Sequence, residues 1–223
     1  MTGKTQLIIF ISIPLILLIS SCDKKKINYW ENGNKKSEIP YKKGKIDGKA
    51  VWWYENGKKQ LESNYKDNIL NGLTIRWFDS GVKQLEANYL NNMLNGTSSE
   101  WYISGKKILE ENYVNDTLHG SYKEWHPIGK LQIEGSYYKG KFEGLWYYYD
   151  LNDKVIGSAN FHKGKGKQIA WYSDGQLKRE INYVDNVKDG KERWWNNDGS
   201  LQKVITYEFG EVISEESYSN GRN

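Results

Sequence analysis

The sequence predicts an all-β protein, built as one elongated antiparallel sheet of β-hairpins that repeat every 24 residues. The first observation is composition: 10 Trp and 17 Tyr among 223 residues favour pleated strands, and only 3 Pro interrupt them. The second is a set of columns in which one residue type returns at a fixed spacing. The third is a turn signal, such as Asn56-Gly57, between aromatic runs.

Two columns define the repeat. The first marks the hairpin turn, and the second lies four residues earlier, in the strand before the turn. Every step is 24 residues long except the step from Asp153 to Gly175, which is 22. The turn column reads Gly33, Gly57, Gly81, Gly105, Gly129, Asp153, Gly175 and Gly199, and the strand column reads Tyr29, Trp53, Trp77, Trp101, Trp125, Tyr149, Trp171 and Trp195.

The N-terminus has the features of an export signal. Lys4 provides a positive start, and an apolar stretch that is short for a membrane span follows from residue 7 to residue 19. The Ile-Ser-Ser-Cys sequence that ends at Cys22, the only cysteine, resembles the lipobox of bacterial lipoproteins. In that family the cysteine becomes the lipidated first residue of the mature protein. The alternative is an ordinary signal peptide or signal anchor in which Cys22 is incidental.

These features divide the chain into four parts. We expect a lipoprotein signal peptide over 1–21, a lipidated tether over 22–27, a repeat array of seven to eight hairpins over 28–210 and a C-terminal cap over 211–223. The lipid on Cys22 would hold the protein at the bacterial cell envelope, with the outer membrane favoured over the inner membrane. Two acyl chains suffice for stable anchoring.

Each hairpin is expected to have a three-residue loop. Glu55 and Asn56 would form a type I turn, and Gly57 would adopt the left-handed conformation of a G1 bulge. This register gathers the apolar columns on one face of the sheet, which we expect to be the packed face. That face would carry Val51, Trp53, Leu61 and Tyr65, and the opposite face would carry Trp52, Tyr54, Gln60 and Glu62.

The connections between hairpins also repeat. A second column of glycines recurs in these connections, nine residues before the turn column. The residue two positions before each of these glycines is aliphatic or aromatic and is expected to pack under the linking turn. The missing two residues lie between Phe161 and Gly166 and are expected to shorten a linking loop. At the C-terminus, Glu215 and Glu216 would discourage edge-to-edge aggregation. The residues expected under the linking turns are Ile46, Leu70, Leu94, Leu118 and Phe142.

The unit Trp-Tyr-x-x-Gly-x-x-x-x-Glu-x-x-Tyr, followed seven residues later by Gly, resembles the MORN (membrane occupation and recognition nexus) repeat. It is closer still to the bacterial MORN-variant repeat. Residues 53–72 and 77–96 carry it most cleanly, and the resemblance extends over about 29–207. It implies an elongated, curved, single-layer sheet that acts as a scaffold for proteins or lipids. Proteins of this type are often placed in the YwqK-type antitoxin family.

Several kinds of chemistry are disfavoured. A net charge of only +4 does not suggest a nucleic-acid partner. A repeated glutamate column, Glu62, Glu86, Glu110 and Glu134, follows one ladder and does not face a second acid across a cleft, unlike the carboxylate pair of a glycosidase. His119, His126 and His162 lack metal-ligand spacing. We therefore expect no catalytic residues, no metal and no cofactor, and a protein that is not an enzyme.

One aromatic column changes identity along the chain, three residues before the turn column. Such drift suggests freedom from packing demands, and aromatic rows stack on sugars or anchor protein interfaces. The alternative is that these rings fill the concave side of a curved sheet. The column reads Trp30, Tyr54, Phe78, Tyr102, His126, Asp150, Tyr172 and Asn196, and its possible binding residues are Tyr54, Phe78, Tyr102, His126 and Tyr172.

The function expected from these features is non-catalytic binding at the envelope membrane. The first hypothesis is a scaffold for a protein partner. The second is glycan binding through the drifting aromatic column. The third is toxin neutralisation in an immunity-type role within the envelope, as the antitoxin family would imply.

Overall fold

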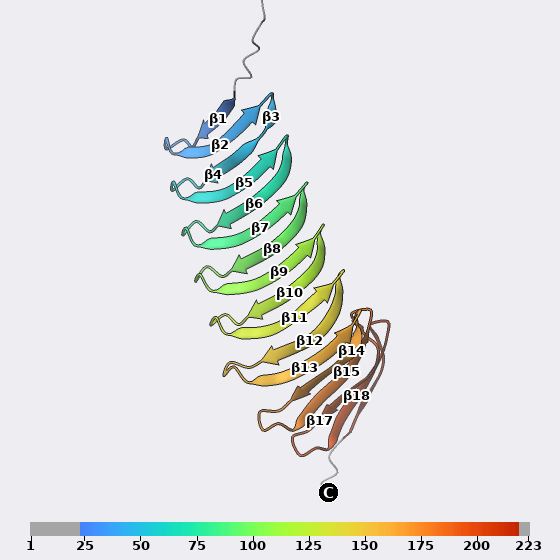
Figure 1. The fold of residues 1–223 in the computed structure, drawn as a ribbon. Helices are drawn as coiled ribbons and strands as arrows, with labels where there is room; N and C mark the ends of the chain where they lie inside the picture. The colour runs from blue at the N-terminus through green and yellow to red at the C-terminus, as the bar shows by residue number, and fades with distance from the viewer. Residues whose placement is uncertain (1–22, 219–223) are drawn as a thin grey trace, which may run out of the picture.

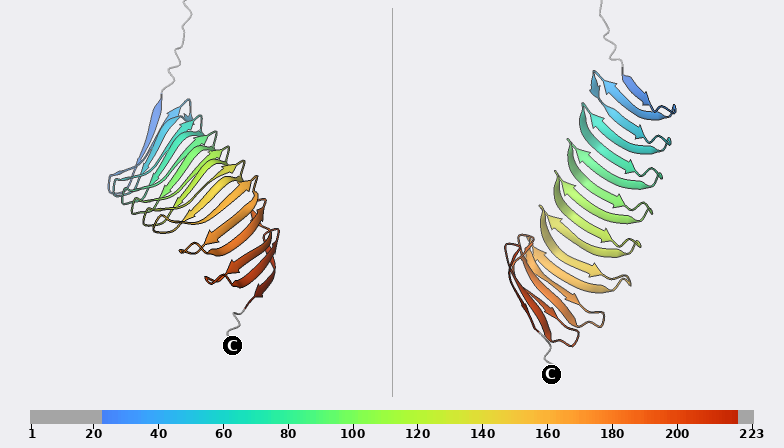
Figure 2. Two further views of the ribbon diagram at one scale, coloured as in Figure 1. Left: turned by 60° about the horizontal axis from the view of Figure 1, so that its bottom comes forward. Right: turned by 180° about the vertical axis from the view of Figure 1, so that it is seen from behind.

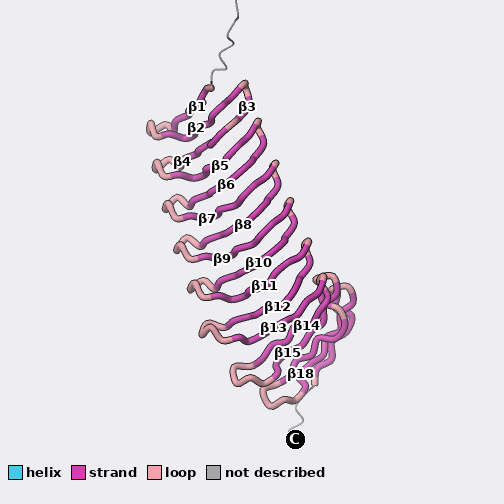
Figure 3. The backbone as a smooth tube through the Cα atoms, in the orientation of Figure 1, coloured by secondary structure: helices cyan, strands magenta, loops and turns pink. Residues whose placement is uncertain are grey.

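The computed structural model describes residues 23–218, and all of their regular structure belongs to one 19-stranded antiparallel sheet (Figures 1 and 3). Strands that are neighbours in the sequence pair with each other, except that the two shortest strands pair only with the strand before them, which also pairs with the strand after them. Hairpins therefore follow one another along an open sheet, as predicted. The strands are bowed, which gives the elongated sheet a curved cross-section (Figure 2). The strands are β1 (Lys24–Tyr29), β2 (Lys35–Lys42), β3 (Lys45–Ile46), β4 (Gly48–Trp53), β5 (Lys59–Lys66), β6 (Ile69–Trp77), β7 (Lys83–Leu90), β8 (Met93–Trp101), β9 (Lys107–Val114), β10 (Thr117–Trp125), β11 (Leu131–Tyr138), β12 (Lys141–Tyr149), β13 (Val155–His162), β14 (Lys165–Trp171), β15 (Leu177–Val184), β16 (Val187–Lys188), β17 (Gly190–Trp195), β18 (Leu201–Glu208) and β19 (Glu211–Ser217).

The hairpin turns have the predicted three-residue loop. The Gly57 amide donates to the Tyr54 carbonyl at 2.9 Å, and the Tyr54 amide donates to the Lys58 carbonyl at 2.9 Å. Gly57 has φ of 81°, the left-handed conformation that glycine adopts without steric cost. The same pair of bonds recurs in the seven other hairpin turns of the described chain, including the turn that holds Asp153 in place of glycine.

A second irregularity follows the turn and reverses the predicted faces. Trp53 lies opposite Lys59, but Trp52 lies opposite Leu61, so β5 has one extra residue at this point. Because neighbouring side chains along a strand point to opposite faces, one extra residue moves Leu61 and Tyr65 away from the face of Trp53. The expected grouping of Val51 and Trp53 with Leu61 and Tyr65 is therefore wrong.

The two faces can be named by their tryptophans. The Trp52 face carries Trp52 and Ala50 of β4 together with the residues that pair with them on β5. It continues across the sheet through Leu61, Arg76 and Leu85. The Trp53 face carries Val51 and Glu62, which lie opposite each other, and the repeated tryptophan column.

The linking turns at the other edge have two residues in type I′ geometry. Both residues have positive φ, such as 53° for Asn91 and 68° for Asn92, which matches the twist of the flanking strands. Successive turns are joined by backbone bonds, because the Asn92 amide donates to the Leu70 carbonyl at 2.9 Å. The Leu70 amide in turn donates to the Asn92 side chain at 2.7 Å. The turn pairs are Lys43-Gly44, Asp67-Asn68, Asn91-Asn92, Asn115-Asp116, Lys139-Gly140, Lys163-Gly164, Asp185-Asn186 and Phe209-Gly210.

The residues expected under these turns lie on the Trp52 face, each opposite an aromatic ring. Leu70 pairs with Tyr65, and Phe142 pairs with Tyr137. The missing two residues do not shorten the turn. Phe161 pairs directly with Gly166, whereas other repeats carry an irregularity at this point, so the deletion removes the bulge and leaves the two-residue turn intact. Strands after this point turn away from the line of the preceding ones (Figure 1).

The most buried aromatic cluster lies on the Trp52 face around β10–β13. Trp146 is 3% exposed, and its ring lies 5.0 Å from Phe142 and 5.4 Å from Tyr122 between centroids. Gly135 makes room for it, because a Cβ there would meet the Trp146 ring at 2.1 Å. Elsewhere on this face the central positions are small and buried, as at Ala50 and Ala87.

Both ends of the sheet differ from the expected boundaries. Residues 24–27, expected in the tether, begin β1, which pairs with β2 to form a complete hairpin. Residues 211–217, expected as a cap, form the exposed edge strand β19, in which Glu215 and Glu216 lie. Cys22 and the expected signal peptide lie outside the described residues.

Candidate binding groove on the Trp52 face

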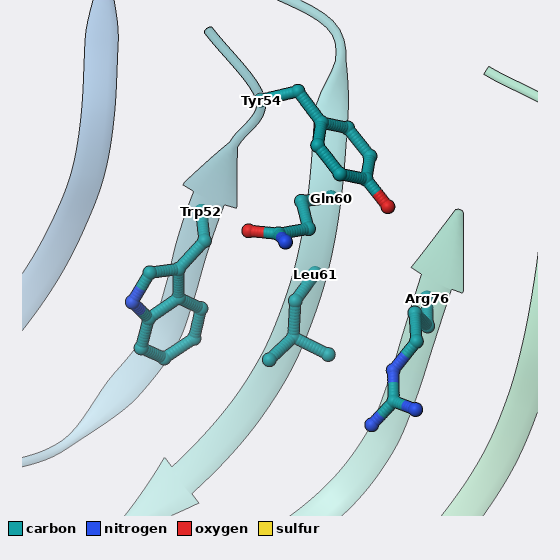
Figure 4. Close-up of a pocket in the computed structure, with 5 residues that line it drawn as sticks. All are labelled: Trp52, Tyr54, Gln60, Leu61 and Arg76. Carbon is teal, nitrogen blue, oxygen red and sulfur yellow. The ribbon is translucent and has the colours of Figure 1, made fainter. Parts of the chain in front are cut away.

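Two adjoining hollows lie on the Trp52 face near the hairpin turns. The larger measures 420 Å³, and its five lining residues all lie on the same side of β4–β6 (Figure 4). The smaller measures 190 Å³ and shares Arg76 with the first. The first is lined by Trp52, Tyr54, Gln60, Leu61 and Arg76, and the second by Arg76, Phe78, Gln84, Leu85, Glu100, Trp101 and Ile108.

We call these two hollows and their continuation along the sheet the Trp52-face groove. Its floor is aliphatic, because Leu61, Leu85 and Leu109 occupy the same position in successive hairpins. Its wall near the turns is the drifting column, to which Tyr54 and Phe78 belong. Equivalent residues lie about 9–10 Å apart, the width of two strands. The groove is therefore a shallow, repeating surface and has no deep enclosed cavity.

The rings in the wall also join neighbouring hairpins. The Tyr54 hydroxyl donates to the Trp77 carbonyl at 2.7 Å, and the Tyr172 hydroxyl donates to the Trp195 carbonyl at 2.7 Å. His126 Nε2 lies 3.2 Å from the Tyr149 carbonyl. The column thus has a structural role that its drift did not indicate, because these contacts hold the rings of Tyr54, His126 and Tyr172 in place.

The Trp53 face is different, because its repeated side chains bind one another. The Lys59 ammonium lies 5.5 Å from the centre of the Trp77 ring and 2.8 Å from the Glu62 carboxylate. Lys107 repeats this arrangement with Trp125 and Glu110, at 5.2 Å and 2.5 Å. Cation–π and ion-pair contacts of this kind explain why the lysine, tryptophan and glutamate columns recur together. The predicted structural role of the glutamate column fits these contacts.

The pKa of Glu62 reflects its contacts with lysines. Burial alone would raise the pKa of this carboxyl, but hydrogen bonds from Lys49 and Lys59 outweigh burial and lower it.

A separate hollow of 270 Å³ lies beyond the lysine row and includes Tyr147 of the Trp53 face. It provides an aromatic control site away from the Trp52-face groove.

Three carboxylates on the Trp52 face have different surroundings. Glu100 and Glu124 both lie opposite Leu109, and Glu111 lies two residues along β9 from Leu109. Glu111 accepts a hydrogen bond from the Tyr113 hydroxyl, and Glu124 accepts one from the Tyr122 hydroxyl at 3.0 Å. Among residues 23–218, none of the three carboxylates makes an ion pair.

The charge of these carboxylates helps to raise the pKa of the tyrosines beside them. Burial first, and then the hydrogen bond and charge of Glu111, raise the pKa of Tyr113. Burial, with a contribution from Glu111, raises the pKa of Tyr137 to about 12. The Tyr113 and Tyr137 hydroxyls therefore lie beside negative charge at the centre of the Trp52 face.

The structure places the five expected binding residues at equivalent turn-proximal positions, and two of them, Tyr54 and Phe78, line the hollows. Sequence reasoning missed the floor and the charged row that contains Trp52, Arg76 and Glu100. These residues also change identity from repeat to repeat, so the criterion that selected the ring column could have found them. Leu61 of the floor was assigned to the face opposite Trp52 and Tyr54, because the extra residue in β5 was not foreseen.

Within the described part of the chain, no group of three or more His, Cys, Asp or Glu residues could hold a metal ion. None of the described residues belongs to a helix that is long and apolar enough to cross a membrane.

Comparison with known proteins identifies the repeat. The family model for the MORN repeat variant matches five segments, at residues 23–43, 46–67, 118–139, 165–185 and 188–209. Each segment corresponds to one hairpin, and the structure builds the same hairpin at the positions between them. No curated protein matches the chain. The chain therefore contains MORN-variant repeats at five places, in a sheet whose intervening hairpins have the same architecture.

Proposed function

We propose that the protein is a non-catalytic repeat scaffold that binds a protein partner in the Trp52-face groove and is held at the bacterial cell envelope by a lipid on Cys22. The observation that carries the binding proposal is the contrast between the faces. Along β2–β10 the Trp53 face has its rings covered by lysines, whereas the Trp52 face keeps rings, aliphatic floor and charges open in adjoining hollows. Aromatic and arginine side chains in such hollows are typical anchors of protein interfaces.

The membrane anchor rests on the sequence that ends at Cys22. Only Asp23 separates this cysteine from β1, so a lipid there would hold the first hairpin close to the membrane surface. Mass spectrometry of the protein purified from membranes tests this part. We expect a diacyl-modified N-terminus at Cys22, and Cys22→Ala should abolish the modification. An unmodified mature N-terminus in the wild type would contradict the anchor.

The experiment that tests the groove removes its rings. The partner is first captured by crosslinking in intact cells, and its binding is then measured for Tyr54→Ala, Phe78→Ala, Tyr102→Ala and the triple variant. Tyr54→Phe removes the bond to the Trp77 carbonyl and retains the ring, which separates packing from contact. Tyr147→Ala on the Trp53 face is the matched control.

The outcome distinguishes the kinds of ligand. A protein partner concentrates its binding energy in one or two anchors, so one single variant should dominate. A glycan that stacks on every ring is the second candidate, favoured by the regular spacing of the column, and should give similar modest losses at each position. Toxin neutralisation within the envelope would be one form of the protein binding proposed here. Unchanged binding by a folded triple variant would exclude the groove.

A further inference from the structure

The Trp52-face groove has a charge pattern that specifies its occupant more closely. We propose that the partner presents an extended segment whose groove-facing side chains, at every second residue, are alternately basic (Lys or Arg) and apolar, and that the basic groups bind Glu100, Glu111 and Glu124. This inference rests on the proposed function, because it names the chemistry of the partner at the same site.

The three carboxylates lie beside an apolar floor. Glu100 and Glu124 flank Leu109 on neighbouring strands, and Glu111 lies two residues further along β9. Glu100 also lines the smaller hollow with Phe78 and Leu85. An occupant of the groove therefore meets apolar side chains and carboxylates at alternating positions.

These three carboxylates have no ion-pair partner among the described residues. On the Trp53 face the same strands pair their glutamates with lysines, as in Lys83–Glu86 and Lys107–Glu110. On the Trp52 face, Glu111 and Glu124 accept hydrogen bonds from tyrosine hydroxyls, and none of the three carboxylates makes an ion pair within residues 23–218. Arg76 is the only cation among the residues that line the hollows. Arg76 and Glu100 line the smaller hollow together, whereas Glu111 and Glu124 lie further along the same face without an ion-pair partner among the described residues, so that stretch of the groove is negative.

Other kinds of occupant fit the groove less well. The carboxylates do not form a group that could hold a metal ion within the described part of the chain. An acidic glycan would be repelled, and a neutral glycan would leave the carboxylates without a partner. Lysine and arginine supply the missing charge, and their aliphatic stems suit a groove with a leucine floor. The shallow hollows, spaced by the repeat, favour an extended segment over a single bulky side chain.

The test measures binding of defined peptides by fluorescence anisotropy. The protein used begins at Asp23 and contains all nineteen strands, and circular dichroism checks that each variant is folded. The probe is the nine-residue peptide Lys-Ser-Leu-Ser-Lys-Ser-Leu-Ser-Lys (the Lys-Leu peptide), in which Lys and Leu alternate on one side of an extended chain, and its counterpart (the Glu-Leu peptide) has Glu in place of each Lys. We expect binding of the Lys-Leu peptide to weaken as salt rises, and no binding of the Glu-Leu peptide.

A charge-matched pair of variants locates the interaction. Glu100→Gln, Glu111→Gln and Glu124→Gln together should weaken binding of the Lys-Leu peptide about tenfold, the combined effect of three partly exposed ion pairs. Glu62→Gln, Glu86→Gln and Glu110→Gln on the Trp53 face change the net charge equally and should leave binding unchanged. If the first triple variant does not fold, the exposed Glu100→Gln replaces it, with Glu86→Gln as its control.

Three results would overturn the inference. Equal loss in both triple variants would mean that only net charge matters. Equal binding of the two peptides would remove the role of basic groups. Binding of neutral cell-wall oligosaccharides that depends on Tyr54 and Phe78 but not on the carboxylates would confirm the groove and reject the partner chemistry. Failure of the proposed function itself is recognised separately, because the captured partner would then bind a folded ring variant as tightly as the wild type.

Discussion

At the residue scale, buried charge is concentrated at Glu192 on the C-terminal part of the Trp52 face. This side chain is 1% exposed and lies 2.9 Å from the Lys188 ammonium and 2.7 Å from Arg179 Nε. The contact with Arg179 is close but is not aligned as a hydrogen bond. Burial alone would raise the pKa of Glu192, but Lys188, Tyr207 and Arg179 outweigh burial and lower it below 4.5.

The lowered pKa gives a pH prediction. Because the folded pKa lies below the unfolded value, ionised Glu192 stabilises the fold above about pH 4.5, and this contribution is lost as pH falls through the folded pKa. Glu192→Gln leaves Arg179 and Lys188 without their partner and should lower the free energy of unfolding by about 3–5 kcal/mol at pH 7. Urea denaturation at pH 7 and pH 3 checks this. The difference from wild type should shrink at pH 3, and an equal difference at both values would contradict the account.

A second residue-scale prediction concerns the tryptophans. The repeated column was expected to be the packed core, but Trp101 is half-buried on the Trp53 face beside Lys83 and Lys107. Trp146 is 3% exposed, so Trp146→Ala should cost about 3–5 kcal/mol of unfolding free energy. Trp101→Ala should cost clearly less in the same chemical denaturation. Equal costs would show that the Trp53 face contributes as much packing as the Trp52 face.

At the element scale, the turns show what sequence patterns can predict. Gly57 predicted its hairpin turn because a left-handed residue is a local requirement that glycine meets. The extra residue in β5 could not be predicted in this way. Lys59 and Gln60 carry no special backbone requirement, and the bulge is stabilised by contacts with neighbouring hairpins, such as that of Lys59 with Trp77. The fold was therefore predictable, but the composition of the faces and of the groove floor was not.

The linking turns provide the element-scale prediction. Asn92 has φ of 68°, and its side chain accepts a bond from the Leu70 amide. Asn92→Gly keeps the conformation but loses the bond, at a cost of about 1 kcal/mol. Asn92→Ala loses the bond and adopts left-handed geometry with a Cβ, which adds about 1–2 kcal/mol. Thermal unfolding of both variants should rank wild type above Gly and Gly above Ala, and a more stable Ala variant would contradict the turn assignment.

At the scale of the whole molecule, each hairpin contacts mainly its neighbours, so the array should tolerate loss of one unit. Deleting residues 81–104 joins Ser80 to Gly105 and removes 24 residues in register. This variant should remain a β-sheet with cooperative unfolding by circular dichroism. Deleting residues 81–92 joins segments out of register and should prevent folding. The account would be wrong if the two deletions behaved alike.

The same scale limits what sequence can reveal about function. MORN-variant repeats predict the architecture because each repeated column meets one structural demand. Binding depends on positions that vary between repeats, such as Arg76 and Glu100, and repeat patterns give no rule for those positions. A binding role for these residues can be inferred only after the register of the strands shows that they lie together on one face.

The central claim is that the Trp52 face is the binding face. The most direct measurement is photo-crosslinking in intact cells, with one photoreactive amino acid placed at one of two positions on the adjacent strands β6 and β7. Gln84 lines the smaller hollow, whereas Leu73 on the adjacent strand points to the Trp53 face. We predict that a protein partner is crosslinked from position 84 and not from position 73. Crosslinking from position 73 alone, or equally from both positions, would contradict the account.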